Sequence, residues 1–339
     1  MSRLAKTLEI RTSPHIISGY DADTIMFNVV VALAPVTLFA VYAFGWAALL
    51  GLTTAVASCL AAERAACRGS GRPATLGDWS AAVTGLLYGL TLPPGLPLWM
   101  VAVGGAISIW IGKSIFGGLG FNPFNPALVG RAVLQATFPV AMTSWIPAFA
   151  DERFARLPAS LLTVPFAKPA YDALSGATPL AAWKFARQPT DVSDLALGFV
   201  GGSAGETSAL LIVLGGAYLV LRNFMSWRTP VAIFAAVGAL AAVLHQVDPA
   251  RYASAGFMLF SGGLALGAVF MATDMVTSPI TPRATWVYGA LIGTLVVVIR
   301  TWGGMPEGVM YAILLGNATA PHLDRWLQPK VFGTSRVSS

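Results

Sequence analysis

Residues Thr24–Phe44 read TIMFNVVVALAPVTLFAVYAF, an apolar run of 21 residues that contains no charged side chain. A helix of this length, at about 1.5 Å per residue, crosses the roughly 30 Å hydrocarbon core of a bilayer. The other clear apolar runs are Trp46–Ala62, Leu98–Ile111, Ser208–Leu221, Val231–Leu244, Gly256–Ala272, Trp286–Ile299 and Gly308–Ala320. Two weaker runs, Trp79–Leu92 and Pro126–Met142, are interrupted by Gly or polar residues. Together the runs predict an all-α integral membrane protein with about ten transmembrane helices.

The composition excludes several classes of protein. Hydrophobic residues make up 56% of the 339 and charged residues only 11%, whereas about a quarter of a soluble domain is charged. The two cysteines, Cys59 and Cys67, are too few to ligate an iron–sulfur cluster. The three histidines, His15, His245 and His322, lie outside the apolar runs or at the end of one, so no facing pair is available for a haem. A redox role for this chain therefore needs a cofactor that takes no metal ligands from it.

The distribution of basic residues predicts how the chain crosses the membrane. The net charge of +6 arises from short loops between the apolar runs, which indicates topology rather than nucleic-acid binding. With the N-terminus inside and the spans alternating, thirteen Lys and Arg residues fall inside, and only Arg251 and Arg300 fall in short outer loops. Cytoplasmic loops carry such an excess. We expect both termini to be cytoplasmic and a long periplasmic loop over residues 143–207.

Two similar halves flank that long loop. A Gly- and Pro-interrupted run, Thr84–Pro97, precedes a full span in the first half, and Ser261–Pro282 precedes one in the second. Because five helices is an odd number, the second half would enter the membrane inverted, with a binding site where the two repeats meet. The predicted order is an N-terminal cytoplasmic segment (1–23), a five-helix repeat (24–142), the loop (143–207), a second five-helix repeat (208–320) and a cytoplasmic tail (321–339).

The loop contains the sequence DALSGATPL, Asp172–Leu180. Small residues before Thr178 leave its hydroxyl unobstructed, although such a string by itself is more often an ordinary turn. Together with three further motifs, this sequence resembles the family that contains RnfD of the Rnf electron-transport complex and, more distantly, NqrB of the sodium-translocating NADH:quinone reductase. The resemblance covers almost the whole chain, and the other motifs are SPH (Ser13–His15), GGLGFNPFNPALVGRA (Gly117–Ala132) and ATDMVTSPITP (Ala272–Pro282).

The resemblance implies a covalent flavin. In that family the Thr of S-G-A-T is esterified by the phosphate of flavin mononucleotide (FMN), which corresponds here to Thr178. The preceding motif residues would then be read by a flavin transferase; they are Asp172, Ser175, Gly176 and Ala177. Among the loop's aromatic residues, Trp183 is a candidate to stack on the flavin ring, or else an anchor at the membrane interface.

Related subunits also hold a second, non-covalent flavin (riboflavin) within the helix bundle. Asn122 and Asn125 can hydrogen-bond a planar ring, unless their loop only closes the bundle or docks a sister subunit. Ionisable residues near membrane depth are expensive, which makes Asp274 and Arg131 candidates for an ion pathway. The alternative is a structural Asp274–Arg131 ion pair that joins the two repeats.

The function implied by the resemblance is that of a membrane subunit in a redox-driven pump. Rnf complexes exchange electrons between NADH and ferredoxin and move Na⁺ or H⁺. This chain has no nucleotide-binding glycine fingerprint, so NADH is expected on a partner subunit, and electrons would pass through the flavin on Thr178. Two alternatives use no cofactor: a channel or secondary transporter for a small solute, and a structural anchor for catalytic subunits.

Overall fold

The computed structural model describes residues 21–71, 75–165, 167, 177–206 and 208–329, and these are helical or irregular with no strand. The first half contains α1 (Ala22–Phe44), α2 (Trp46–Gly69), η1 (Leu76–Asp78), α3 (Ser80–Leu90), α4 (Leu98–Trp110), η2 (Ser114–Phe116), α5 (Pro126–Thr137) and α6 (Pro139–Met142). A connecting segment carries α7 (Pro179–Ala181), η3 (Ala182–Ala186) and α8 (Val192–Leu197). The second half contains α9 (Ala209–Leu221), α10 (Arg228–Val247), α11 (Ala255–Phe260), α12 (Leu264–Leu266), η4 (Gly267–Met271), α13 (Pro282–Trp302) and α14 (Val309–Trp326).

Five of these helical stretches are long and apolar enough to cross a membrane: α1, α2, the stretch Leu98–Phe116, α10 and α13. This confirms a multi-pass membrane protein. The apolar helices α3 and α9 have 11 and 13 residues, which is about 17–20 Å of helix and short of the hydrocarbon thickness. The apolar run Gly256–Ala272 is not one helix, because α11 ends at Phe260 and a new helix begins at Leu264. The break lies at the start of Ser261–Pro282, the Gly- and Pro-rich run that was expected to be interrupted. Gly262 makes that break with a φ of +64°.

Close packing of the helices depends on glycine. A Cβ on Gly85 of α3 would lie 2.7 Å from the Cα of Val56 on α2, and one on Gly293 of α13 would lie 2.7 Å from the Ile233 carbonyl of α10. Small residues at such contacts let helix backbones approach in a membrane, where dispersion contacts replace the hydrophobic effect. The two halves meet where α1 packs against α9.

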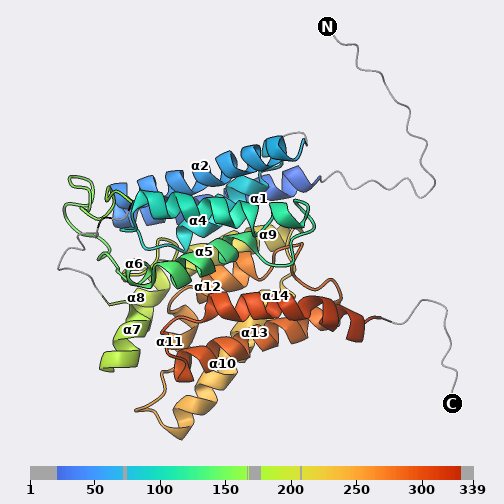
Figure 1. Ribbon diagram of the computed structural model, residues 1–339. Helices are drawn as coiled ribbons and strands as arrows, with labels where there is room; N and C mark the ends of the chain where they lie inside the picture. The colour runs from blue at the N-terminus through green and yellow to red at the C-terminus, as the bar shows by residue number, and fades with distance from the viewer. Residues whose placement is uncertain (1–20, 72–74, 166, 168–176, 207, 330–339) are drawn as a thin grey trace, which may run out of the picture.

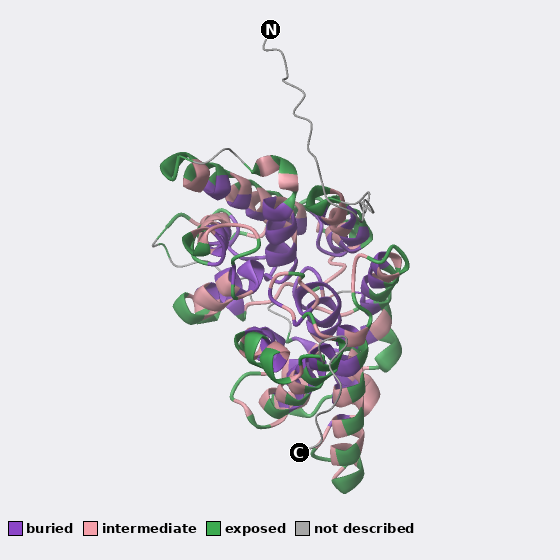
Figure 2. Cartoon of the chain, turned by 90° about the vertical axis from the view of Figure 1, so that its right-hand side faces the viewer, coloured by how far each residue is buried: buried purple, intermediate pink, exposed green. Residues whose placement is uncertain are grey.

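The helices lie roughly along one direction (Figure 1). The described ends of the chain, at α1 and α14, emerge at one end of the bundle, and the segment with α6, α7 and α8 lies at the other. The end-on view shows buried residues gathered at the centre and exposed ones on the rim (Figure 2). Much of that rim is apolar, as the exposed side chains of Leu38, Leu221, Val243 and Leu315 illustrate. Helices that are apolar on their outer face fit a lipid environment.

Candidate functional site

Thr178 lies at the start of a short helical segment that spans residues 177–187, which we call the strap. Its Oγ1 accepts a hydrogen bond from the Ala181 backbone N–H at 3.2 Å, so Thr178 caps the N-terminus of α7. Pro179 occupies the first helical position, where its missing N–H costs nothing. Thr178 is 8% exposed, whereas Ala177 is exposed. The other predicted motif residues, Asp172, Ser175 and Gly176, lie outside the described residues.

Lys184 fastens the strap to the end of α13. Its ammonium donates to the carbonyls of Arg300 (3.0 Å), Gly303 and Met305 (2.9 Å). A cation at a helix C-terminus satisfies carbonyls that have no partner within the helix. Burial lowers the pKa of Lys184, while the three carbonyls favour its charged form.

A cavity of about 500 Å³ lies against the strap, and we call it the Thr178 cavity. Its size falls within the range of about 300–1,000 Å³ that is typical of cofactor sites. The aromatic residues that line it are Trp145, Phe185 and Tyr311, and the charged ones are Arg131, Glu206 and Glu307. Its lining therefore combines aromatic residues that suit a flat apolar ring with charged residues that suit a polar group.

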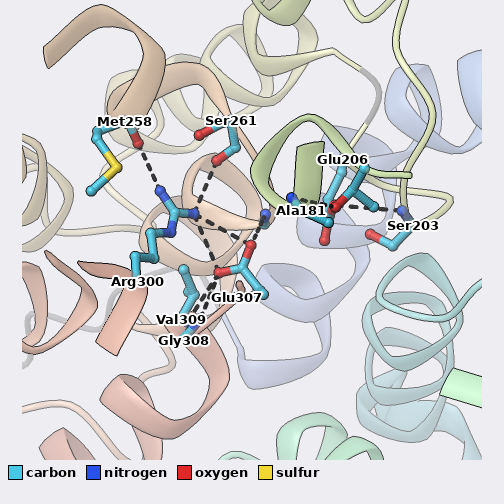
Figure 3. Close-up of polar contacts among 11 residues, drawn as sticks. Ala181, Ser203, Glu206, Met258, Ser261, Arg300, Glu307, Gly308 and Val309 are labelled. Carbon is cyan, nitrogen blue, oxygen red and sulfur yellow. Dashed lines mark hydrogen bonds and ion pairs between the residues drawn. The ribbon is translucent and has the colours of Figure 1, made fainter. Parts of the chain in front are cut away.

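The best-satisfied charges in this region are Arg300 and Glu307 (Figure 3). Arg300 Nη2 contacts Glu307 Oε1 at 3.2 Å, and the same guanidinium donates to the carbonyls of Met258 (2.8 Å) and Ser261 (2.9 Å). Glu307 also accepts from the backbone N–H of Gly263 at 3.1 Å. Desolvation opposes ionisation of Glu307, but the neighbouring arginines outweigh it and lower its pKa. The pair thus holds both sides of the break between α11 and α12.

Arg131 and Glu206 are less well satisfied. Arg131 is 8% exposed, and its Nε is buried without a hydrogen-bond partner. Glu206 accepts a weak bond of 3.5 Å from the Ser203 backbone N–H. Desolvation, and then the nearby charge of Glu307, raise the pKa of Glu206. At the wall of the Thr178 cavity, the Arg131 guanidinium and the Glu206 carboxylate therefore have hydrogen-bonding groups that the protein does not fully satisfy.

The structure separates some residues that the sequence grouped together. Trp183 lines a neighbouring cavity of about 150 Å³, where it packs on Phe257 with ring centroids 5.8 Å apart. It is absent from the lining of the Thr178 cavity, and its stacking on a flavin stays a prediction. Arg131 and Asp274 line different cavities, and no ion pair joins them in the described chain. Asp274 instead accepts a hydrogen bond from Thr277 Oγ1 at 3.1 Å.

A smaller cavity, of about 90 Å³, contains the two asparagines. Asn125 caps α5 by accepting from Ala127 N at 3.0 Å, and its Nδ2 donates to the Met271 carbonyl at 3.3 Å. Asn122 Nδ2 donates to the Phe124 carbonyl at 3.2 Å. Both amide groups are thus already engaged in holding the loop and in joining it to η4.

Sequence reasoning missed the charge pairs that support both cavities. Lys113 lines the smaller one and forms a buried ion pair with Glu63 at 2.7 Å. Glu63 directly follows the apolar run that ends at Ala62, and Arg300 directly follows the one that ends at Ile299. These pairs could have been suspected from the sequence, because each has a charged residue directly after an apolar run. That pattern does not reveal which opposite charge is the partner.

Comparisons with known proteins show the family of this chain. A family model described as the NQR2, RnfD, RnfE family matches residues 9–333. A subunit of the ion-translocating oxidoreductase complex from Halorhodospira halophila is 39% identical over 98% of this chain and 97% of its own length. The corresponding subunit from Stutzerimonas stutzeri is 41% identical over 92% of both chains. A subunit of the proton-translocating ferredoxin:NAD(+) oxidoreductase complex from Clostridium ljungdahlii is 39% identical over 96% of both. The chain therefore belongs to the NQR2, RnfD, RnfE family.

Proposed function

We propose that this chain is a membrane subunit of an ion-translocating oxidoreductase complex and carries FMN esterified to Thr178. The names of its relatives support the first part, since they are subunits of such complexes at 39–41% identity over nearly the full chain. The observation that carries the second part is the position of Thr178, whose side chain borders a cavity of about 500 Å³.

The residues around Thr178 fit a flavin phosphate. The cavity has room for a cofactor, aromatic residues that suit a flat ring, and a buried arginine nitrogen without a partner. When bound, a flavin accepts and donates electrons singly or in pairs. The chain's own contribution is to supply the Thr178 oxygen for the ester, to hold it at the cavity through Lys184 and to keep water from the ring with Trp145 and Phe185.

The membrane arrangement that we propose has ten spans in two inverted five-helix repeats. In support, α2 packs on α4 and α4 on α5 in the first half, as α10 packs on α13 and α13 on α14 in the second. The strap lies at the end of the bundle opposite to the described chain ends. With both termini cytoplasmic in a bacterial inner membrane, the strap is periplasmic, where a flavin transferase acts on it.

The proposed partners are the other subunits of the complex, through which electrons pass between NADH and ferredoxin, and the moved ion is Na⁺ or H⁺. Asp274 remains the proposed ion-pathway residue. The second flavin does not fit the cavity beside Asn122 and Asn125, because about 90 Å³ is well below the size of a cofactor site. Riboflavin therefore stays a prediction of the family resemblance.

In-gel flavin fluorescence after denaturing electrophoresis tests the function directly. The chain is co-expressed with an active flavin transferase, and wild type is compared with Thr178→Ala. Thr143→Ala is the matched control, because Thr143 lines the same cavity. We expect a fluorescent band in wild type and in the control that is lost in Thr178→Ala. A dark wild-type band would refute the covalent flavin and favour a transporter without a cofactor.

A further inference from the structure

Arg131 is a buried cation with no partner in the described part of the chain. It lies on α5, is 8% exposed and borders the same cavity as Thr178. No group accepts a hydrogen bond from its Nε, and no carboxylate of the described residues forms an ion pair with its guanidinium. Arginine is almost never fully buried unless it is paired, since an isolated charge loses its hydration without compensation. Glu206 and Glu307 are near enough for the Arg131 charge to lower the pKa of each, but neither forms an ion pair with it, so no anion is directly bonded to Arg131.

The two nearby carboxylates do not supply a directly bonded anion. Glu307 is occupied by Arg300 and by the backbone N–H groups of Gly263, Gly308 and Val309. Glu206 lies near Glu307. It forms no ion pair with Arg131 in the described part of the chain, and it accepts the weak hydrogen bond from the Ser203 backbone N–H. With Glu307 held by Arg300, the Arg131 guanidinium keeps hydrogen-bonding capacity toward the Thr178 cavity.

We propose that the Arg131 guanidinium binds the phosphate that joins the flavin to Thr178. The inference rests on the proposed function and adds a residue to it. A phosphate esterified on both sides carries a single negative charge, which matches the single unpaired cation. The planar guanidinium presents its N–H groups as a fork that fits two phosphate oxygens at once. Because Thr178 and Arg131 line one cavity from different helices, this contact fixes the phosphate end of the flavin between the strap and α5.

The proposal predicts that flavin attachment stabilises the chain through Arg131. The experiment compares flavinylated chain with chain produced without the transferase, and it measures the midpoint of unfolding by SDS in detergent micelles. Wild type, Arg131→Gln and the control Arg156→Gln are compared; the Arg156 side chain is 79% exposed and outside the Thr178 cavity. We expect flavinylation to raise the midpoint of wild type and Arg156→Gln by the same amount, and that of Arg131→Gln by clearly less.

The anisotropy of flavin fluorescence gives a second readout on the same samples. Loss of the phosphate contact should let the attached flavin rotate faster, so the anisotropy falls in Arg131→Gln and stays at the wild-type value in Arg156→Gln. An equal gain in midpoint for all three proteins, with equal anisotropy, would overturn the proposed phosphate contact of Arg131, but not the proposed covalent flavin. If Arg131→Gln does not accumulate, Arg131→Lys replaces it, and a full wild-type gain in that variant overturns the forked contact.

In-gel fluorescence of wild type separates this inference from the function on which it rests. A fluorescent wild-type band with an Arg131→Gln variant that behaves like wild type refutes only the role of Arg131. A dark wild-type band, with the transferase active, refutes the covalent flavin and the phosphate contact together.

Discussion

Replacing Arg300 by methionine should cost the chain a large part of its stability. Arg300 Nη1 donates to the Met258 carbonyl and Nη2 to the Ser261 carbonyl, and Nη2 pairs with Glu307. The Arg300 side chain is 1% exposed, so water replaces none of these contacts in the variant. A buried carbonyl that loses its hydrogen-bond donor costs about 1–3 kcal/mol of stability. Removing one partner of a buried ion pair costs about 3–5 kcal/mol in all. We expect Arg300→Met to lower the free energy of unfolding by about 3–5 kcal/mol.

The assay is reversible unfolding by SDS in dodecylmaltoside micelles, followed by circular dichroism. Arg325→Met is the control, because Arg325 is exposed near the end of α14, and it should change stability by less than about 0.5 kcal/mol. The double variant Arg300→Met/Glu307→Gln should be more stable than the sum of the two single changes predicts, since no lone charge remains. A single variant within about 0.5 kcal/mol of wild type, or strict additivity in the cycle, would refute the stabilising role of Arg300 at the break between α11 and α12.

Three further predictions test other parts of the structure. Lys184→Met should release the strap from α13, and limited proteolysis should then cleave within residues 177–187 faster than in wild type; unchanged cleavage would mean that other contacts hold the strap. Gly85→Val should destabilise the chain by about 1–3 kcal/mol in the same SDS titration, whereas Gly51→Val should not, because a Cβ at Gly51 meets nothing within 4 Å. Desolvation raises the pKa of Asp274 above its ordinary value of 3.8, so at pH values between the two pKa values the native chain binds more protons than the unfolded chain. Stability should therefore fall as pH rises from the ordinary pKa to the raised one, and Asp274→Asn should remove that part of the fall; an identical pH profile in the variant contradicts the assignment.

The long spans could be predicted from the sequence because each is a local pattern. Thr24–Phe44 was expected as one span, and the structure has α1 over Ala22–Phe44. An interruption was expected somewhere in the Gly-rich run Ser261–Pro282, but its position at Gly262 was not predicted, since glycine is common in membrane helices and an apolar run has the same composition whether or not it is broken. What stabilises the break is Arg300, which lies 39 residues beyond Ser261, and no local pattern reports such a contact.

At the candidate site too, residues of a local motif could be predicted, whereas residues that reach the cavity from distant parts of the sequence could not. Thr178 was found from a motif of adjacent residues and from the family resemblance. Trp183 was chosen for stacking from among the aromatic residues of the loop 143–207, whereas the loop residues that border the cavity include Trp145, more than thirty residues upstream of Thr178. Arg131 was recognised as an unusual membrane charge and grouped with Asp274, as a candidate for the ion pathway or as its ion-pair partner, because sequence spacing does not reveal which cavity a helical residue lines.

The shielding of Thr178 has a consequence for how the protein is made. In the finished fold its oxygen already caps α7 and the side chain is 8% exposed, so a modifying enzyme meets a hydroxyl that is largely out of reach. The proposed attachment of a flavin would then have to occur early, before the strap packs on the bundle, or the contacts of Lys184 with α13 would have to break during the reaction. In that proposal, modification and folding follow a fixed order, and a chain in which the strap packs first would remain without the proposed flavin.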